Sequence, residues 1–239
     1  MKPKADSSEV TSAISVEKMR ESDAYTIAHF VESKELMRRA AQGVFDAVDW
    51  SGKKIAPKVA PKSAPEAAPN SAPENAPKVA IIAGSGNNGG DGYALAGILA
   101  DHGIRAQVFR VSEKFSADGL FYYHRAMEKG VPDRLFSQGC SLAGYDIIVD
   151  CILGTGFAGI PRGGAAEAIR AINDGRQSGA FVVSVDINSG MNGDTGEAEL
   201  AVRSDLTVSI GFYKTGMFRG RAPELIGDLV NAGIGITLV

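Results

Sequence analysis

Three glycine-rich segments, each following a short apolar run, carry most of the residues that could do chemistry. The first, GSGNNGGDG from Gly84 to Gly92, follows the run VAIIA. Between a strand and a helix, such a segment presents unpaired backbone N–H groups to an anion and lets a ligand approach closely. Its spacing matches neither the dinucleotide fingerprint GxGxxG nor a phosphate loop ending in GK[ST]. Ligand binding therefore competes with a plain strand-to-helix turn capped by Asp91.

The second and third segments add the acids Asp150 and Asp186 and the hydroxyl of Ser189. They run from Asp150 to Arg162 and from Val185 to Gly196, and each begins at the end of an apolar run. The Asp150 carboxylate is costly to bury alone, so it needs a cation or hydrogen-bond donors, unless it only caps the turn. The glycines of the second segment suit a second phosphate or the rest of an extended ligand.

The oxygen atoms of these segments favour a hard cation over a transition metal. Asn88, Asp150 and Ser189 offer amide, carboxylate and hydroxyl oxygens, whereas His and Cys ligands are not gathered there. If the strands are neighbours, Asp186 faces the same crevice as these three residues. Lys214 follows another apolar run and meets either a phosphate or solvent.

The elements that would position these segments alternate between β-branched runs and helix-length stretches. This alternation predicts an α/β fold: a doubly wound, mostly parallel, Rossmann-like sheet with helices on both faces. Such sheets bind ligands at the carboxyl ends of their strands, where all three segments begin. The predicted strands are 79–83, 106–111, 145–151, 181–187, 206–210 and 229–236, and the predicted helices between them are 93–102, 117–129 and 164–173.

The part of the chain before the first strand predicts two helices and a spacer. The helices cover about 15–29 and 33–50, the second with an apolar face and Ser33 as its cap. Residues 55–77 repeat Ala-Pro every four residues, which predicts an extended, semi-rigid insertion. It is either a surface insertion or a docking peptide for a partner. We expect one domain over 1–239, on which the helices of about 15–50 pack.

Composition excludes several classes of function. A formal charge of -3 and a pI near 5.7 argue against nucleic-acid binding. The sequence has no signal-like start and no apolar run that could span a membrane, so we expect a soluble, cytoplasmic protein. Cys140 and Cys151 are expected to be buried free thiols rather than a disulfide.

Taken in order, the motifs resemble those of the NAD(P)H-hydrate epimerase family, whose domain is known as the YjeF N-terminal domain. MRESDAYTI at 19–27 resembles its N-terminal helix, and GNNGGDG at 86–92 its most distinctive motif. Asp150 with the following GTG, and then VDINSG at 185–190, complete the series. The resemblance covers nearly the whole chain.

The resemblance implies an isomerase that interconverts the R and S forms of NADHX and NADPHX, the hydrated forms of the nicotinamide cofactors, as metabolite repair. It implies a homodimer, and a separate NAD(P)HX dehydratase that acts on the S product, since the chain ends without a dehydratase domain. It further implies Asp186 as the catalytic, substrate-contacting acid and one potassium ion per subunit on Asn88, Asp150 and Ser189. The implied cofactor-binding residues are Asn87, Asn88, Gly89, Gly90, Asp91, Gly154, Thr155, Gly156, Phe157, Ala158, Gly159, Ile160 and Asp186.

The sequence departs from the family at a few places. Asn188 and Thr215 stand where the family usually or commonly has proline, and the Ala-Pro insertion interrupts a short link. A non-catalytic binding or scaffolding module of the same fold is the alternative, disfavoured because Asp186 and the three cation ligands are kept. An NAD-dependent oxidoreductase is disfavoured because the second strand ends at Arg110 without an acid for the adenine ribose.

Overall fold

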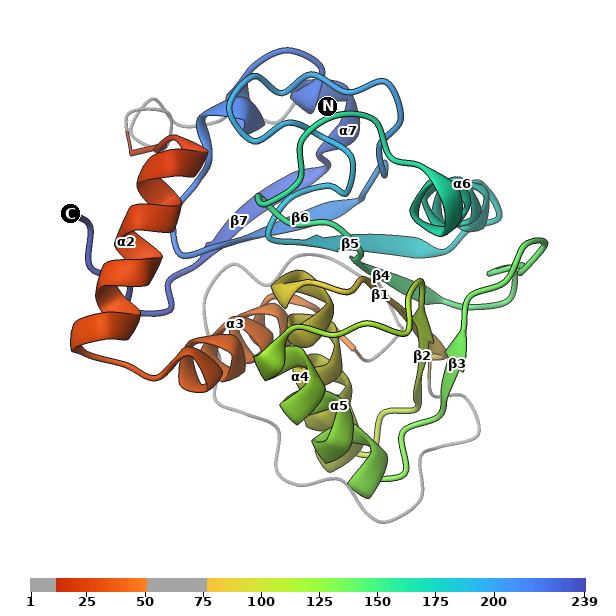
Figure 1. The fold of residues 1–239 in the computed structure, drawn as a ribbon. Helices are drawn as coiled ribbons and strands as arrows, with labels where there is room; N and C mark the ends of the chain where they lie inside the picture. Colours follow the sequence, from red (N-terminus) through yellow and green to blue (C-terminus); the bar gives the residue numbers. More distant parts are fainter. Residues whose placement is uncertain (1–11, 51–76) are drawn as a thin grey trace.

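A seven-stranded parallel sheet forms the centre of the computed structural model, which describes residues 12–50 and 77–239 (Figure 1). The strand order is β3-β2-β1-β4-β5-β6-β7, and every neighbouring pair is parallel. The predicted α/β, doubly wound class is confirmed. The strands are β1 (Val79–Ala83), β2 (Ala106–Arg110), β3 (Asp133–Leu135), β4 (Ile147–Cys151), β5 (Phe181–Val185), β6 (Leu206–Ile210) and β7 (Asp228–Ala232).

Helices cover both faces of this sheet (Figure 1). On one face lie α3 (Ser33–Ala47), α4 (Asn87–Asp101) and α5 (Ala117–Glu128), and α6 (Gly163–Gln177) lies on the other. Each face has its own apolar cluster, because strands buried on both sides alternate their side chains between the two layers. Helix α2 (Val16–His29), the short helix η1 (Thr215–Phe218) and α7 (Ala222–Leu225) complete the described elements.

The strand order places a crevice beside β1. After β1 the chain adds β2 and β3 on one side, and then returns to add β4 and its successors on the other. The connections after β1 and β4 therefore leave the sheet edge in opposite directions, which opens a ligand-sized space at the ends of these strands. Ala83 and Cys151, the last residues of β1 and β4, are paired in register at that point.

Helix α2 is fixed at the edge of this crevice by contacts with distant segments. The backbone N–H of Val16 donates to Asp194 Oδ1 at 2.8 Å, and Thr26 Oγ1 accepts from the N–H of Thr237 at 2.9 Å. The N-terminal helix thus depends on both the loop after β5 and the end of the chain. This explains how residues near position 20 reach a site built by strands more than 60 residues away.

Element boundaries differ from the sequence predictions in informative places. Strand β3 was not predicted, because it has three residues, two of them exposed. Helix α3 ends at Ala47 rather than near Trp50, and Ser33 is its first residue rather than its cap, which is Glu32. Helix α4 begins at Asn87 rather than Tyr93, so most of the segment predicted as a loop is the first two turns of a helix.

Asn188 replaces the expected proline by a buried hydrogen-bonded anchor. Its Nδ2 donates to Val202 O, Ser204 Oγ and Leu225 O at 2.9–3.1 Å, and its Oδ1 accepts from Thr207 Oγ1 at 2.8 Å. A fully buried amide with all these partners satisfied tethers the loop after β5 to β6 and α7. Side-chain bonds here do the stiffening that a proline ring would do through the backbone.

Other predictions have a mixed outcome. Both cysteines are free, as predicted, but only Cys151 is buried, whereas Cys140 is half-buried. The Ala-Pro insertion lies, apart from Pro77, outside the residues that the structure describes, and the prediction of one domain over 1–239 stays a prediction. Within residues 12–50 and 77–239, no helix is long and apolar enough to cross a membrane.

Candidate functional site

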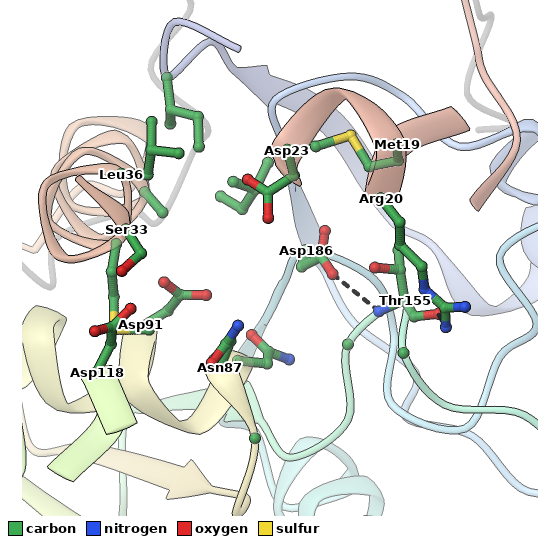
Figure 2. A pocket seen from close by; sticks show the side chains of 18 of the residues that line it. Met19, Arg20, Asp23, Ser33, Leu36, Asn87, Asp91, Asp118, Thr155 and Asp186 are labelled. Carbon is green, nitrogen blue, oxygen red and sulfur yellow. Dashed lines mark hydrogen bonds between the residues drawn. The ribbon is translucent and has the colours of Figure 1, made fainter. Parts of the chain in front are cut away.

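A cavity of about 550 Å³ opens at the carboxyl ends of β1, β4 and β5. Its walls come from α2 and α3, from the start of α4, from the loop after β4 and from Asp186 after β5 (Figure 2). The apolar part of the lining includes Leu36, Met37 and Ile234, and the polar part includes four carboxyl groups and one buried amide. A mixed lining of this kind suits a small molecule with a flat apolar portion and a few polar groups.

Asp186 occupies a strained position at the end of β5. Its φ of 68° makes it the one non-glycine residue with positive φ in the described chain. The Ile187 N–H donates to Val185 O at 2.8 Å, which closes a three-residue turn around Asp186, and the Asp186 N–H donates to Val208 O on β6. Asp tolerates left-handed backbone better than most residues, yet the conformation still costs free energy. Such a position points to a functional constraint.

Both oxygens of the Asp186 carboxylate have partners. Lys214 Nζ lies 2.5 Å from Oδ1, and the backbone N–H of Thr155 donates to Oδ2 at 3.0 Å (Figure 2). Lys214 is completely buried and also donates to Ser209 Oγ and Ile210 O. The sequence-based expectation that Lys214 meets a phosphate or solvent is therefore wrong: its charge is turned inward and fixes the acid.

Two more carboxyl groups, of Asp23 and Asp91, line the same cavity (Figure 2). Within the described residues neither one accepts a hydrogen bond or forms an ion pair. Burial, and next the negative charge of Asp186, raise the pKa of Asp23. Burial raises the pKa of Asp91 well above its ordinary value, and the charges of Asp186 and Asp23 add to this, while Lys214 opposes it. One ammonium group therefore faces a cluster of three carboxyl groups.

Asn88 contributes a buried amide without partners. It lies in the first turn of α4, is 6% exposed and lines the cavity, and neither Nδ2 nor Oδ1 has a hydrogen-bond partner among residues 12–50 and 77–239. A buried polar group left unpaired costs about 1–3 kcal/mol, so such groups call for an explanation. Because both atoms lie beside an open cavity, the amide is placed to bind a ligand or an ion.

Asp150 and Ser189 lie beneath the cavity rather than in its wall. Both are fully buried, and Ser189 Oγ donates to Asp150 Oδ1 at 2.5 Å. The carboxylate also accepts from the N–H of Ser189, from Ser184 Oγ and from the N–H of Ile152. Burial raises the pKa of Asp150, and these hydrogen bonds oppose the shift. The sequence predicted that the buried Asp150 carboxylate needs either a cation or hydrogen-bond donors, and the structure supplies the donors.

Most glycines of the first segment serve packing rather than ligand approach. A Cβ on Gly89 would lie 2.0 Å from the carbonyl oxygen of Gly84, and one on Gly84 would lie 1.9 Å from that of Ile152. These contacts are with protein backbone, so the two glycines allow the start of α4 to pack closely against the end of β1 and the loop after β4. Gly86, by contrast, has no atom of the described residues within 4 Å of its would-be Cβ, and it lines the cavity. The expectation of close ligand approach therefore applies to Gly86, whereas Asp91 lies inside α4 and is no cap.

The structure brings together part of the predicted site. The predicted residues that line the cavity are Asn87, Asn88, Asp91, Gly154, Thr155, Gly156, Phe157 and Asp186. The predicted residues outside its lining are Gly89, Gly90, Asp150, Ala158, Gly159, Ile160 and Ser189.

Sequence reasoning missed several residues of the site. Arg20 and Asp23 were assigned to a helix alone, and Asp118 to no role, although all three line the cavity. Asp23 and Arg20 lie inside the MRESDAYTI motif, so the motif carried a signal whose meaning depended on where α2 packs. The partnership of Lys214 with Asp186 had no signal, because 28 residues separate them.

Comparisons with known proteins agree with this architecture. A model of the family described as YjeF-related protein N-terminus matches residues 33–216. An NAD(P)H-hydrate epimerase of Limosilactobacillus reuteri is 32% identical over 224 residues, which cover 92% of this chain and 93% of the relative. A bifunctional NAD(P)H-hydrate repair enzyme of Thermofilum pendens is 37% identical over 159 residues, which are 63% of this chain but only 30% of that longer enzyme.

A solved structure shares the fold. The crystal structure of the yeast protein ynu0 superposes with a TM-score of 0.66 at 21% identity, covering 92% of this chain and 86% of the yeast chain. At that identity the likeness concerns the arrangement of the sheet and its helices.

Proposed function

We propose that this chain, which belongs to the family described as YjeF-related protein N-terminus, is an NAD(P)H-hydrate epimerase. In this role it interconverts the R and S forms of NADHX and NADPHX, which carry a hydroxyl on C6 of the nicotinamide ring. The observation that carries the proposal is Asp186, an acid held in a strained conformation at the cavity wall. The name of the L. reuteri relative, matched over 93% of its length, supports the same activity.

The polarity of the cavity supports a dinucleotide substrate. The first N–H groups of α4 have no partners within the helix, so the helix start attracts phosphate. The Arg20 guanidinium lies at the rim, 3.4 Å from Thr155 O, and adds positive charge. Asp23 and Asp186 come from other elements, α2 and the loop after β5, and their negative charge stabilises a ring that becomes cationic and disfavours a phosphate. The nicotinamide end therefore belongs beside Asp186.

The reaction needs proton transfer at the C6 hydroxyl and a way to carry positive charge. The C6–O bond breaks as the hydroxyl takes a proton and leaves as water, and the ring nitrogen supplies electrons to form an iminium. Water then adds to C6 from the opposite face and gives up a proton, so atoms and electrons balance without an oxidant. Asp186 serves as one acid-base group and as a counter-charge to the iminium.

A bound potassium ion is a further part of the proposal. The oxygen atoms of Asn88, Asp150 and Ser189 fit a hard cation, and the unpaired Oδ1 of Asn88 is the observation that supports one. Asn88 packs beside Gly154, and Ser189 Oγ accepts from the N–H of Leu153, so both border the same loop. Such an ion would tie the three segments together and offset phosphate charge.

Removal of the ion tests that role. Activity measured after exhaustive exchange of potassium and sodium for a large organic cation should fall, and potassium should restore it. A melting temperature that rises on adding potassium would give a readout independent of turnover, because a ligand of the native state stabilises it. Unchanged melting and activity without either ion would contradict the cation site.

The epimerase proposal is tested by chromatography. R-NADHX is incubated with the purified protein, and the appearance of S-NADHX is compared with the slow spontaneous rate. A large acceleration is the expected result. No acceleration by folded protein in potassium buffer would favour the non-catalytic binding module instead, and a binding screen with intact NAD would test the oxidoreductase reading.

The product also indicates a partner reaction. The S form is the expected substrate of a separate NAD(P)HX dehydratase, and the names of the bifunctional repair enzymes among the relatives support a functional link between the two steps. Assembly as a homodimer remains a prediction.

A further inference from the structure

Epimerisation at C6 poses a geometric problem for a single carboxylate. The hydroxyl leaves from one face of the nicotinamide ring, and water must return on the other. Asp186 is held by Lys214 and by the N–H of Thr155, so it cannot swing around a bound ring. General acid-base help requires a group within about 3 Å of the oxygen that gains or loses the proton. A second group on the opposite wall is therefore needed.

Asp91 meets this requirement by its place in the fold. It comes from α4, which follows β1, whereas Asp186 follows β5, and β4 lies between these two strands. Figure 2 shows the two residues on opposite sides of the hollow. The Asp91 carboxyl has no hydrogen bond or ion pair with any residue of the described chain, so no internal partner occupies it. Asn88, one turn earlier on the same wall, likewise keeps its buried amide unpaired.

We propose that Asp91 is a second catalytic acid-base residue, which handles the proton on the face of the nicotinamide ring opposite to Asp186. This inference rests on the proposed epimerase function. It converts a one-residue mechanism into a two-residue one, in which each carboxyl serves one epimer.

The protonation states of the two acids suit this division. Burial among the charges of Asp186 and Asp23 raises the pKa of Asp91, which favours its protonated form, whereas Asp186 is ion-paired with Lys214. Asp91 gives its proton to the hydroxyl on its own face as the C6–O bond breaks. Asp186 takes a proton from the water that forms the new C6–O bond on the other face. Exchange with solvent, or the reverse reaction, then resets both groups.

Asp23 is a weaker candidate for this role. It comes from α2, and Figure 2 shows it above Asp186 rather than across the hollow from it. Its place suggests that it adds negative charge beside Asp186 when the ring becomes cationic. We therefore do not assign Asp23 to proton transfer on either face of the nicotinamide ring.

Oxygen exchange distinguishes two acids from one. We would incubate the intact protein, its Asp91→Asn variant and its Asp186→Asn variant separately with R- or S-NADHX in H₂¹⁸O. The two epimers are then separated, and the ¹⁸O content of each is measured by mass spectrometry. Wild type should epimerise and label both forms. Asp91→Asn should epimerise about 10²-fold more slowly or worse, yet still label one epimer from the Asp186 side. Asp186→Asn should label the opposite epimer.

This reciprocal pattern cannot arise from misfolding, which would remove both exchanges together. Glu128→Gln is the matched control, because it removes a carboxyl from α5 that lies outside the cavity lining. Wild-type epimerisation by Asp91→Asn, or equal loss of labelling in both epimers by a variant whose thermal melt shows that it is folded, would overturn the second acid. A wild-type protein that neither epimerises nor exchanges would instead overturn the proposed function, and the second acid with it.

Discussion

The segments after β1 and after β5 look alike in sequence but do different work. Each is a polar, glycine-rich stretch at the end of an apolar strand. After β1 the chain enters α4 almost at once. Gly84 and Gly89 are needed there because carbonyl oxygens of neighbouring backbone occupy the space that a Cβ would take. After β5 the chain makes a strained turn at Asp186, whose carboxylate is fixed by a buried lysine.

The difference teaches that the number of glycines is a poor guide to where the chemistry lies. The first segment is rich in glycine because a helix must start close against the sheet, and its reactive groups, Asn88 and Asp91, lie on the helix itself. The segment after β5 holds Asp186 in a conformation that needs support from β6 and Lys214. The following variants test this contrast between a packed helix start and a strained acid.

The largest expected effect is on the strained acid. Asp186→Asn should lower the rate of epimerisation by about 10²–10⁴-fold, because the amide cannot exchange protons as a carboxylate does. The fold should persist, since Asn also tolerates positive φ. Turnover is measured by chromatography and folding by a thermal melt. Near wild-type turnover in a folded variant would remove Asp186 from the mechanism.

The support of that acid comes next. Lys214→Met should lower the free energy of unfolding by about 2–3 kcal/mol, because it leaves the Asp186 carboxylate without its charge partner while keeping a similar volume. The double variant with Asp186→Asn should lose less than the sum of the single losses, which a denaturant series can measure. Simple additivity would mean that the ion pair contributes nothing.

The helix start is tested by a pair of glycine variants. Gly89→Ala should lower the free energy of unfolding by about 2 kcal/mol. The new Cβ would clash with the Gly84 carbonyl oxygen, and the free-energy cost of that clash exceeds the gain from alanine's higher helix propensity. Gly86→Ala, with nothing within 4 Å, should change it by less than about 0.5 kcal/mol. Equal effects of the two changes would refute the packing explanation.

The smallest expected effect is on pH dependence. The pKa of Asp91 is raised in the folded protein from its ordinary 3.8, so between these values the folded state binds more protons than the unfolded state. Asp91 therefore costs stability as pH rises through that window. The melting temperature of Asp91→Asn minus that of wild type should increase from pH 4 to pH 8, since burial, and next the charges of Asp186 and Asp23, raise this pKa against the opposing effect of Lys214. A constant difference would show that Asp91 does not titrate in that window.

The sequence predicted the sheet better than the site. Strands β1 and β6 have their predicted bounds, because β-branched runs flanked by turn residues have few other ways to fold. The start of α4 was placed six residues late, at Tyr93 rather than Asn87, because glycine has poor helix propensity and only tertiary packing makes it helical there. Asp23 could not be assigned, since its helix reaches the cavity through contacts with Asp194 and Thr237.

Sequence alone determined the α/β class, the strands that end in polar segments, and the presence of Asn88, Asp91 and Asp186 near their ends. These follow from local patterns of apolar and polar residues, which act over a few neighbours. Only the tertiary structure decided that Lys214 turns inward to hold Asp186 and that Asp91 faces it across a cavity. Such facts depend on which strands become neighbours and how helices pack on them, and hence on burial and charge contacts between residues far apart in the chain.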